Sequence, residues 1–211
     1  MASSKAYLAM LVALQMLAIE LGARRGTIGP EVATSLISGL RALPGKVQAA
    51  LGREDRIATL ARRYRDVEHV FFIGRGLDHP VAMEGSLKLK EISYVHSEAL
   101  AAGELKHGTL ALVVPGVPVF ALVTQGHVYE KTVSNIQEVK ARGAEVIALA
   151  YDDDTQIGRY VDEVIRIPRV LDLLAPVVAI VPLQLFAYHV AAERGHDIDQ
   201  PRNLAKSVTV E

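Results

Sequence analysis

Two carboxylates and one amine recur at helical spacing in the segment that follows Pro80. At about 100° per residue, Glu84, Lys88 and Glu91 fall within about 60° of one another on one side of a helix, whereas Lys90 points away. Such a Glu–Lys pair is in most helices only a solvent-exposed support worth roughly 0.3 kcal/mol. The same groups can also abstract a proton beside a carbonyl while the amine polarises an oxygen, so the stripe is a candidate acid–base site.

Further candidates lie outside that helix. His107 stands in a glycine-punctuated stretch, where an imidazole can exchange protons near neutral pH, although a solvated surface histidine is the plainer interpretation. Lys206 lies in a tail otherwise poor in lysine, and a desolvated lysine can form an imine with a sugar carbonyl. The histidine spacing fits no common zinc motif and the aspartates at 152–154 suit a solvated loop, so we expect no metal.

A glycine-rich turn at residues 74–76 invites comparison with dinucleotide-binding loops. Gly74 and Gly76 follow an apolar run and precede a helical pattern, but His79 occupies the sixth position of that fingerprint, where glycine is required. No Walker loop occurs in the sequence either. We therefore predict a turn that uses the backbone freedom of glycine, and no cofactor.

Composition limits the chemistry further. The chain has 211 residues, half of them apolar, which is enough for one large domain with its own core. Its 23 Lys and Arg residues are matched by 24 Asp and Glu residues, so no basic excess is available to bind nucleic acid. The absence of cysteine excludes disulfides, thiolate metal sites and a cysteine nucleophile.

Two apolar stretches are long enough to raise the question of a membrane. Residues 6–19 contain Gln15, are followed by Glu20 and lack a clear cleavage site, which favours a buried helix over a signal peptide. Residues 173–190 carry two prolines, a glutamine and a histidine, which favours a core helix packed on a sheet. We therefore expect a cytoplasmic protein without a membrane segment.

The elements that must position these residues change in type near residue 67. Residues 1–66 predict only helices, with one ending near Gly22 and a break at Pro44 and Gly45. Short apolar runs then alternate with long helical patterns. The runs are 70–73, 117–123, 145–150 and 164–167, and the helical patterns are 80–95, 129–142 and 171–194.

This alternation predicts an α/β fold, a doubly wound parallel sheet flanked by helices. We expect a helical segment at 1–66, the sheet domain at 67–195 and a C-terminal tail at 196–211. Doubly wound sheets bind ligands at the carboxyl ends of their strands, which here points to the loops after residues 73, 123 and 150.

The helical stripe belongs to a set of motifs that together resemble one enzyme family. The chain contains GRG at 74–76, EGSLKLKEISY at 84–94, AGELKHG at 102–108 and DQPRNLAKSVTVE at 199–211. These resemble the glutamine–fructose-6-phosphate aminotransferases, or glucosamine-6-phosphate synthases, over essentially the whole chain. The matching part is the second of two sugar isomerase (SIS) domains and the tail of the family's isomerase region.

The resemblance implies roles for the residues of the stripe. Glu91 would move a proton between sugar carbons 1 and 2, Lys88 would belong to the same site, and Glu84 would orient a histidine. That histidine opens the sugar ring in the family. It corresponds to His107, which would come from the neighbouring subunit of a homodimer.

Three residues near the chain ends also match the family's sugar site. Lys206 corresponds to the lysine that forms an imine with open-chain fructose 6-phosphate, and Ala205 to a backbone contact with the sugar. Ser3 lies where the family's upstream domain ends beside the substrate. Conversion of this ketose towards glucosamine 6-phosphate needs a base, a ring-opening group and an amine, without metal or redox cofactor.

The chain departs from the family's pattern in two substitutions and in two missing features. Ser86 replaces a common alanine and Thr109 a common proline, and both changes look tolerable. The family's glutaminase cysteine and its Ser/Thr-rich phosphate-binding loop have no counterpart here. We therefore expect an isomerase-region fragment that is incomplete by itself. The alternative is a non-catalytic SIS module that binds sugar phosphates or dimerises.

Overall fold

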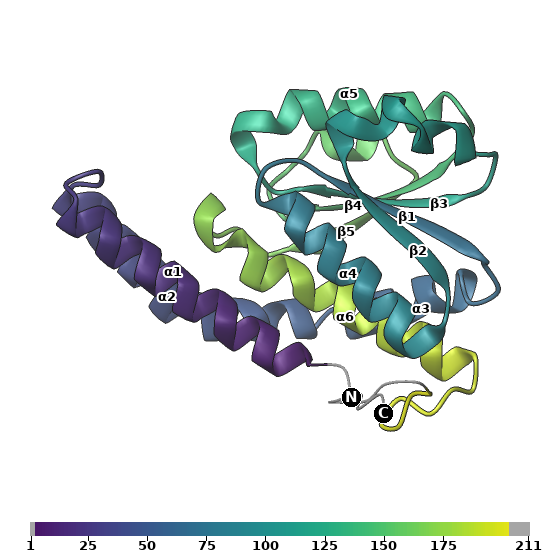
Figure 1. Ribbon diagram of the computed structural model, residues 1–211, viewed down its shortest axis with the longest axis horizontal. Coiled ribbons are helices and arrows are strands. Elements are labelled where there is room, and N and C mark those ends of the chain that lie inside the picture. The colour runs from purple at the N-terminus through teal and green to yellow at the C-terminus, as the bar shows by residue number, and fades with distance from the viewer. Residues whose placement is uncertain (1–2, 203–211) are drawn as a thin grey trace, which may run out of the picture.

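The computed structural model describes residues 3–202, which form a parallel sheet with helices on both faces (Figure 1). The strands are β1 (His69–Gly74), β2 (His96–Ala101), β3 (Pro118–Val123), β4 (Glu145–Tyr151) and β5 (Glu163–Ile167), in the spatial order β2-β1-β3-β4-β5. The helices are α1 (Ser4–Arg24), α2 (Pro30–Leu51), α3 (Glu54–Arg63), α4 (Asp78–Ser93), α5 (Tyr129–Lys140) and α6 (Ala175–Glu193). Short 3₁₀ helices connect them, including η1 (Ala102–His107) and η2 (Thr109–Leu112).

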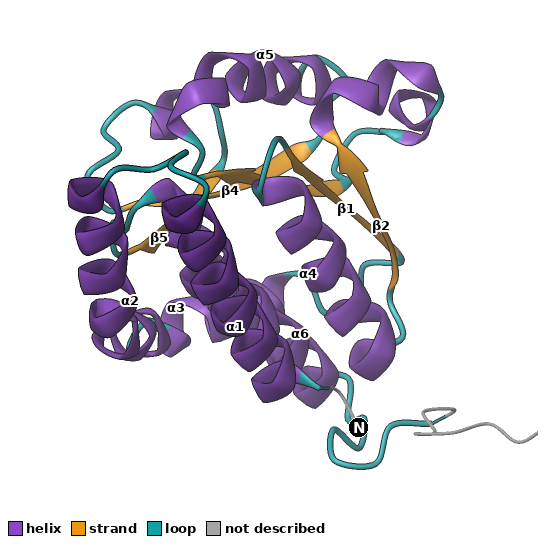
Figure 2. Ribbon diagram, turned by 60° about the vertical axis from the view of Figure 1, so that its left-hand side comes forward, coloured by secondary structure: helices purple, strands orange, loops and turns teal. Residues whose placement is uncertain are grey.

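Side chains of the central strands alternate between two apolar cores. Phe72 and Phe120 point to the face covered by α4 and α6, and their stacked rings lie 5.0 Å apart. Phe71 and Val119 point to the opposite face, which α5 covers. Figure 2 shows α5 on one side of the sheet and the other helices on the other side. The doubly wound parallel fold predicted from the sequence is therefore confirmed.

The central helix α6 explains one of the two apolar stretches. Both α6 with its preceding turn and α1 are long and apolar enough to cross a membrane, but 72% of the window in α6 is buried inside the domain. Leu183 and Phe186 of α6 are almost completely buried, and the Phe186 ring lies 4.6 Å from the ring of Phe120 in β3. The predicted core helix is thus confirmed for this segment.

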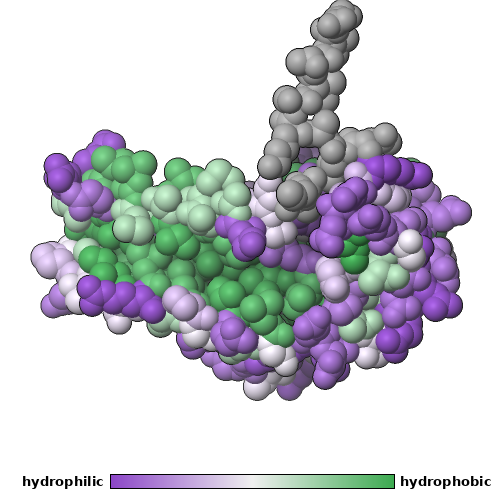
Figure 3. Space-filling view, turned by 90° about the horizontal axis from the view of Figure 1, so that it is seen from below, coloured by the Kyte–Doolittle hydropathy of each residue, from purple (hydrophilic) through white to green (hydrophobic). Residues whose placement is uncertain are grey.

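Helix α1 differs from its prediction as a buried helix. Only 11% of its apolar window is buried, because one side packs on α2 and α6 while the other side faces outward. Figure 3 shows the resulting apolar surface, which extends over α1 and α2. Its large exposed side chains are Met10, Leu14, Met16, Leu17, Leu21, Val32 and Ile37.

Two local predictions are wrong for identifiable reasons. The helix does not break at Pro44, because Leu36, Leu43 and Ala50 bury a continuous side of α2 and this packing outweighs the one hydrogen bond that proline removes. Strand β2 was not predicted, because HSEALA is an edge strand of small and polar residues. This strand is stabilised by its parallel hydrogen bonding with β1, and its own residues are not apolar enough to indicate a strand.

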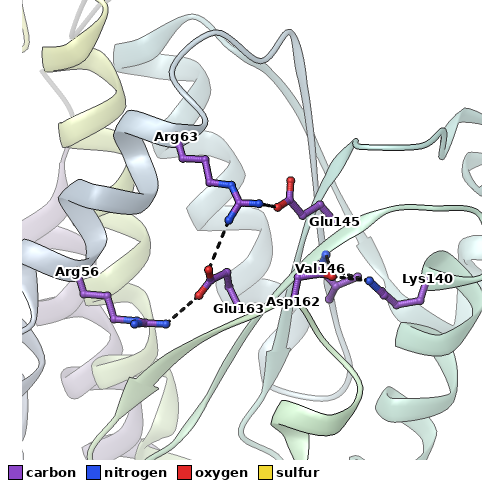
Figure 4. A network of polar contacts seen from close by, with 7 residues as sticks. All are labelled: Arg56, Arg63, Lys140, Glu145, Val146, Asp162 and Glu163. Atoms are coloured by element: carbon purple, nitrogen blue, oxygen red, sulfur yellow. Dashed lines mark hydrogen bonds and ion pairs between the residues drawn. The ribbon is translucent and has the colours of Figure 1, made fainter.

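Ion pairs connect the helices to the amino ends of β4 and β5 (Figure 4). Arg56 and Arg63 of α3 pair with Glu163 at 2.8 and 3.5 Å, and Arg63 also pairs with the first residue of β4. Lys140 at the end of α5 pairs with Asp162 at 2.6 Å. Exposed pairs each contribute less than about 1 kcal/mol, so they orient helices that the two cores already hold.

Candidate active site

The amine and the two carboxylates of the predicted stripe meet on one side of α4. Lys88 Nζ lies 2.5 Å from Glu91 Oε2 and 3.4 Å from Glu84 Oε1. The Lys88 side chain is only 5% exposed, and those of Glu84 and Glu91 are 12% and 20% exposed. The prediction that the three groups share a face is confirmed. Their interpretation as a solvent-exposed ion pair is wrong, because the ammonium is buried.

This cluster carries one more acid than base. Burial raises the pKa of Glu84, and the negative charge of Glu91 raises it further, whereas Lys88 lowers it; the net shift is upward. One ammonium cannot compensate two carboxylates in a partly desolvated site, so protonation of Glu84 is easier than in water. A carboxylate and an ammonium held together in this way can exchange protons with a carbonyl compound.

Close packing on two sides fixes the rotation of α4. Gly85 lies so near α6 that a Cβ atom there would stand 2.6 Å from Leu183 Cδ1. On the sheet side, the buried Ser86 and Ser97 hydroxyls lie 3.0 Å apart and connect α4 to β2. With these contacts made, the Glu84–Lys88–Glu91 side of the helix has a single orientation.

Helix α1 contributes a residue that the sequence reasoning missed. Burial raises the pKa of Tyr7 to about 12, with a further contribution from the negative charge of the nearby Glu84. The backbone N–H of Tyr7 donates to the Ser3 carbonyl at 3.0 Å, so the predicted sugar-contacting Ser3 stands one turn before it and is exposed. The only signal available was that Tyr7 is the single aromatic residue of α1.

The position of the cluster in the sheet differs from the expected ligand crevice. The chain leaves the carboxyl end of β1 at Gly74, and α4 returns it to the amino end, where β2 begins beside His69. Glu91, in the last turn of α4, therefore lies at the amino edge of the sheet. The general rule for doubly wound sheets points to the carboxyl edge, whereas Glu91 stands on a crossover helix at the amino edge.

The predicted strand-end loops hold structural hydrogen bonds beside a cavity of about 260 Å³, whose lining includes Thr124 and Asp154. Asp78, which is 2% exposed, accepts hydrogen bonds from the Thr124 amide at 2.8 Å and from its hydroxyl at 2.5 Å. Burial raises the pKa of Asp78 to about 6 although these bonds act in the opposite direction. The turn needs glycine as predicted, because a Cβ at Gly74 would lie 2.7 Å from the Asp78 backbone and Gly76 has a φ of +56°.

His107 does not meet the stripe within one chain. It ends η1, beyond the carboxyl end of β2, and its neighbour Lys106 pairs with Glu138 of α5 on the opposite face of the sheet. The His107 side chain is 76% exposed and lies 3.9 Å from the Glu104 carboxylate. Within the chain, Glu84 pairs with Lys88 instead of a histidine.

The last described residues lie beside the stripe. A groove of about 550 Å³ opens next to Glu91, and Arg202 is part of its wall. Its lining consists of Leu87, Lys90, Glu91, Tyr94, Val95, His96 and Arg202. The predicted Ala205 and Lys206 lie outside the described residues. Within residues 3–202, no group of three or more His, Asp and Glu side chains could hold a metal ion.

A five-stranded parallel sheet with helices on both faces defines the class of doubly wound α/β domains. The family described as "SIS domain" matches residues 63–194. The chain belongs to the SIS-domain family.

Relatives extend this similarity over the whole chain. The chain is 54% identical to the isomerizing glutamine–fructose-6-phosphate aminotransferase of Caldanaerobacter subterraneus and 52% identical to that of Thermus thermophilus, in each case over 100% of this chain. It covers 34% and 35% of those relatives, so it spans about a third of their length. The C-terminal domain of the glucosamine-fructose-6-phosphate aminotransferase from Francisella tularensis has a similar structure, with 39% identity and a TM-score of 0.88. That similarity covers 95% of this chain and 57% of the other.

Proposed function

We propose that this chain is a fragment of the isomerase region of a glucosamine-6-phosphate synthase, acting on fructose 6-phosphate. The observation that carries the proposal is the buried Lys88 ammonium between Glu84 and Glu91, at 3.4 and 2.5 Å. Burying a cluster of charged side chains costs stability, so a function that needs the cluster is a reason for a protein to keep it. A module that only binds or dimerises needs no such cluster. The similarity to two aminotransferases over the full chain supports the same activity.

In this proposal the residues of α4 move one proton. The Glu91 carboxylate removes a proton from carbon 1 of the open-chain sugar imine and returns it to carbon 2, which converts the ketose skeleton into that of an aldose. Lys88, 2.5 Å away, holds the Glu91 carboxylate in place and compensates its charge. Lys206 would first form an imine with carbon 2 of the sugar, with loss of water. Ammonia would then displace Lys206 and leave fructosimine 6-phosphate, the imine on which Glu91 acts. No metal or other cofactor takes part.

Two subunits would complete each site. His107 lies on the opposite face of the sheet from α4 in its own chain and is 76% exposed, so it is free to reach another molecule. We propose that the protein is a homodimer in which His107 opens the sugar ring in its partner's site and Glu84 orients it. The exchange of such residues is reciprocal in a two-fold dimer.

The chain would need an upstream domain for full activity. The apolar surface of α1 and α2 in Figure 3 would pack on that domain, and Ser3, at the start of α1, would contact the sugar from there. A patch of this kind is larger than single scattered apolar residues and marks an interaction surface. With that surface covered and α6 in the core, we propose a cytoplasmic location.

A chimera tests the proposal. This chain would replace the matching 210 residues of the Caldanaerobacter subterraneus relative, and glucosamine 6-phosphate would be measured after addition of fructose 6-phosphate and glutamine. We expect turnover by the chimera and a loss of at least about 100-fold with Glu91→Gln. Glu130→Gln, an exposed change on α5, is the matched control.

Two results would contradict the proposal. A folded chimera without turnover would favour the non-catalytic binding module, as would full turnover by the Glu91→Gln chimera. The 211-residue chain alone, followed by NMR with fructose 6-phosphate in D₂O, should incorporate no deuterium at carbons 1 and 2 above the Glu91→Gln background. Turnover equal to that of the chimera would show that the upstream domain is dispensable.

A further inference from the structure

Tyr94 has a backbone conformation that its side chain does not favour. Its φ of +59° and ψ of +18° place it in the left-handed region, and it is the one non-glycine residue with positive φ within residues 3–202. It directly follows the last residue of α4, a position where glycine is the usual choice because glycine lacks a Cβ. Non-glycine residues persist in such positions when other contacts require them.

The Tyr94 side chain contacts both ends of the segment that follows α6. The backbone N–H of Arg202 donates to Tyr94 Oη at 2.8 Å, and the Arg202 guanidinium lies over the ring, 4.1 Å from its centroid. The His196 ring packs against the same tyrosine at a centroid distance of 4.6 Å. One aromatic side chain thus holds the first and last parts of residues 196–202.

The segment between these contacts is ordered by its own hydrogen bonds. The Asp197 carboxylate accepts from the amides of Asp199 and Gln200 at 3.0 and 2.8 Å, and Pro201 is buried. Ile198 packs against the larger core. Tyr94 therefore contacts a turn that has its own hydrogen bonds and packing.

The chain just before this turn is hydrogen-bonded to the same end of α4. Arg194, the residue after α6, donates to the Ser93 carbonyl at 3.2 Å and to the Val67 carbonyl at 2.8 Å. The ends of α4 and α6 consequently hold one geometry, which lets a single residue after α4 set the path of the chain after α6. Figure 1 shows the yellow end of α6 beside the lower end of α4.

Tyr94 also stands one helical turn beyond Glu91, the proposed catalytic base. Glu91, Tyr94 and Arg202 line the same groove of about 550 Å³. Lys206 is four residues beyond Arg202, and four residues span at most about 14 Å. Anchoring Arg202 in the groove limits where Lys206 can go.

We propose that Tyr94 is a positioning residue that clamps residues 196–202 in the groove beside Glu91, so that the Lys206 amine meets the same open-chain sugar. This inference rests on the proposed function. The left-handed backbone aims the ring at the turn, and the ring and hydroxyl hold the turn by separate contacts. A glycine at position 94 would suit the backbone better and lose the clamp.

Trypsin measures the clamp without any chemistry on the sugar. It cleaves after Arg202 and after Lys206, and the chain that ends at Arg202, resolved by its mass from the chain that ends at Lys206, reports the cleavage at the clamp. We expect Tyr94→Phe, which loses only the hydroxyl, to speed this cleavage about 5-fold. Tyr94→Gly, which loses hydroxyl and ring, should speed it about 20-fold without lowering the midpoint of thermal unfolding. Tyr188→Ala, a change of an exposed tyrosine on α6, is the control that leaves the cleavage rate unchanged.

Imine trapping in the chimera measures the positioning. Borohydride reduction with fructose 6-phosphate should label Lys206, and Tyr94→Gly should lower the initial labelling rate at least 10-fold at saturating sugar, with Tyr94→Phe between the two. Unchanged cleavage in Tyr94→Gly would overturn the clamp. Faster cleavage with unchanged labelling would overturn positioning. Absence of labelling in the unsubstituted chimera would contradict the proposed function, and the trypsin comparison would still decide the clamp.

Discussion

Lys88 and Glu91 form an ion pair of 2.5 Å on one side of α4, and only 5% of the Lys88 side chain is exposed. Glu84 approaches the same ammonium to 3.4 Å from the preceding turn. The pair is therefore part of a partly desolvated cluster with unequal numbers of acids and bases. This relationship makes the site sensitive to the removal of either partner.

Removing the ammonium should destabilise the domain. Lys88→Met leaves two carboxylates without their cation, and we expect the free energy of unfolding to fall by roughly 2–4 kcal/mol at pH 7. The loss should be smaller at pH 4, because the raised pKa of Glu84 lets this carboxylate take up a proton and leaves less negative charge uncompensated. Urea denaturation at both pH values measures it, with Lys90→Met on the exposed side of α4 as control. Equal effects of the two substitutions would show that the cluster contributes no stability.

The contribution of Asp78 to stability should depend on pH. Burial raises its folded-state pKa to about 6 from an ordinary value of 3.8, so between these values the folded chain holds a proton that the unfolded chain lacks. The stabilisation is full below about pH 4 and is lost as the pH rises through about 6.

A comparison with Asp78→Asn isolates this effect. The free energy of unfolding of the unsubstituted chain, relative to the variant, should fall by on the order of 2 kcal/mol between pH 4 and pH 7. Asp66→Asn removes the charge of a carboxylate whose side chain is 87% exposed in the native chain and is the control. If this difference in unfolding free energy rose with pH instead, the hydrogen bonds from Thr124 would lower the pKa of Asp78 by more than burial raises it.

The same substitution at two helical glycines should have opposite effects. Gly85→Ala places a methyl group 2.6 Å from Leu183 Cδ1, which should cost roughly 1–3 kcal/mol and rotate or displace α4. Gly45→Ala adds a methyl group in open space on α2 and should stabilise by up to about 1 kcal/mol. Thermal unfolding of the two variants measures both. Combining Gly85→Ala with Leu183→Val should recover part of the loss, and no recovery would contradict the contact.

Mixed dimers should show whether His107 acts across the subunit boundary. Chimeras carrying His107→Gln or Glu91→Gln should each be inactive when alone. A mixture refolded together should regain about a quarter of the activity, because half of the dimers are mixed and one of their two sites is intact. No recovery would place both residues in one subunit's site. His107→Gln should shift stability by less than about 0.5 kcal/mol, since the side chain is exposed.

Several features could be predicted because they depend on local spacing. Glu84, Lys88 and Glu91 share a side of α4 by helical geometry alone, whatever packs around them. The central strands were also predictable, because strands buried on both faces, such as β3 and β4, are continuous apolar runs. The edge strand β2 lacks that signal and required its partner β1.

Burial and long-range contact were decided only by the folded chain. The spacing of Lys88 is the same in a solvated helix, and only the surroundings of α4 make its ammonium 5% exposed. Tyr7 lies near Glu84 although the two stand in different helices far apart in the sequence, and Tyr94 binds Arg202, 108 residues away. Residue type and spacing thus determine which groups share a helix face. Desolvation, and therefore their chemistry, depends on which distant segments the two cores bring against that face.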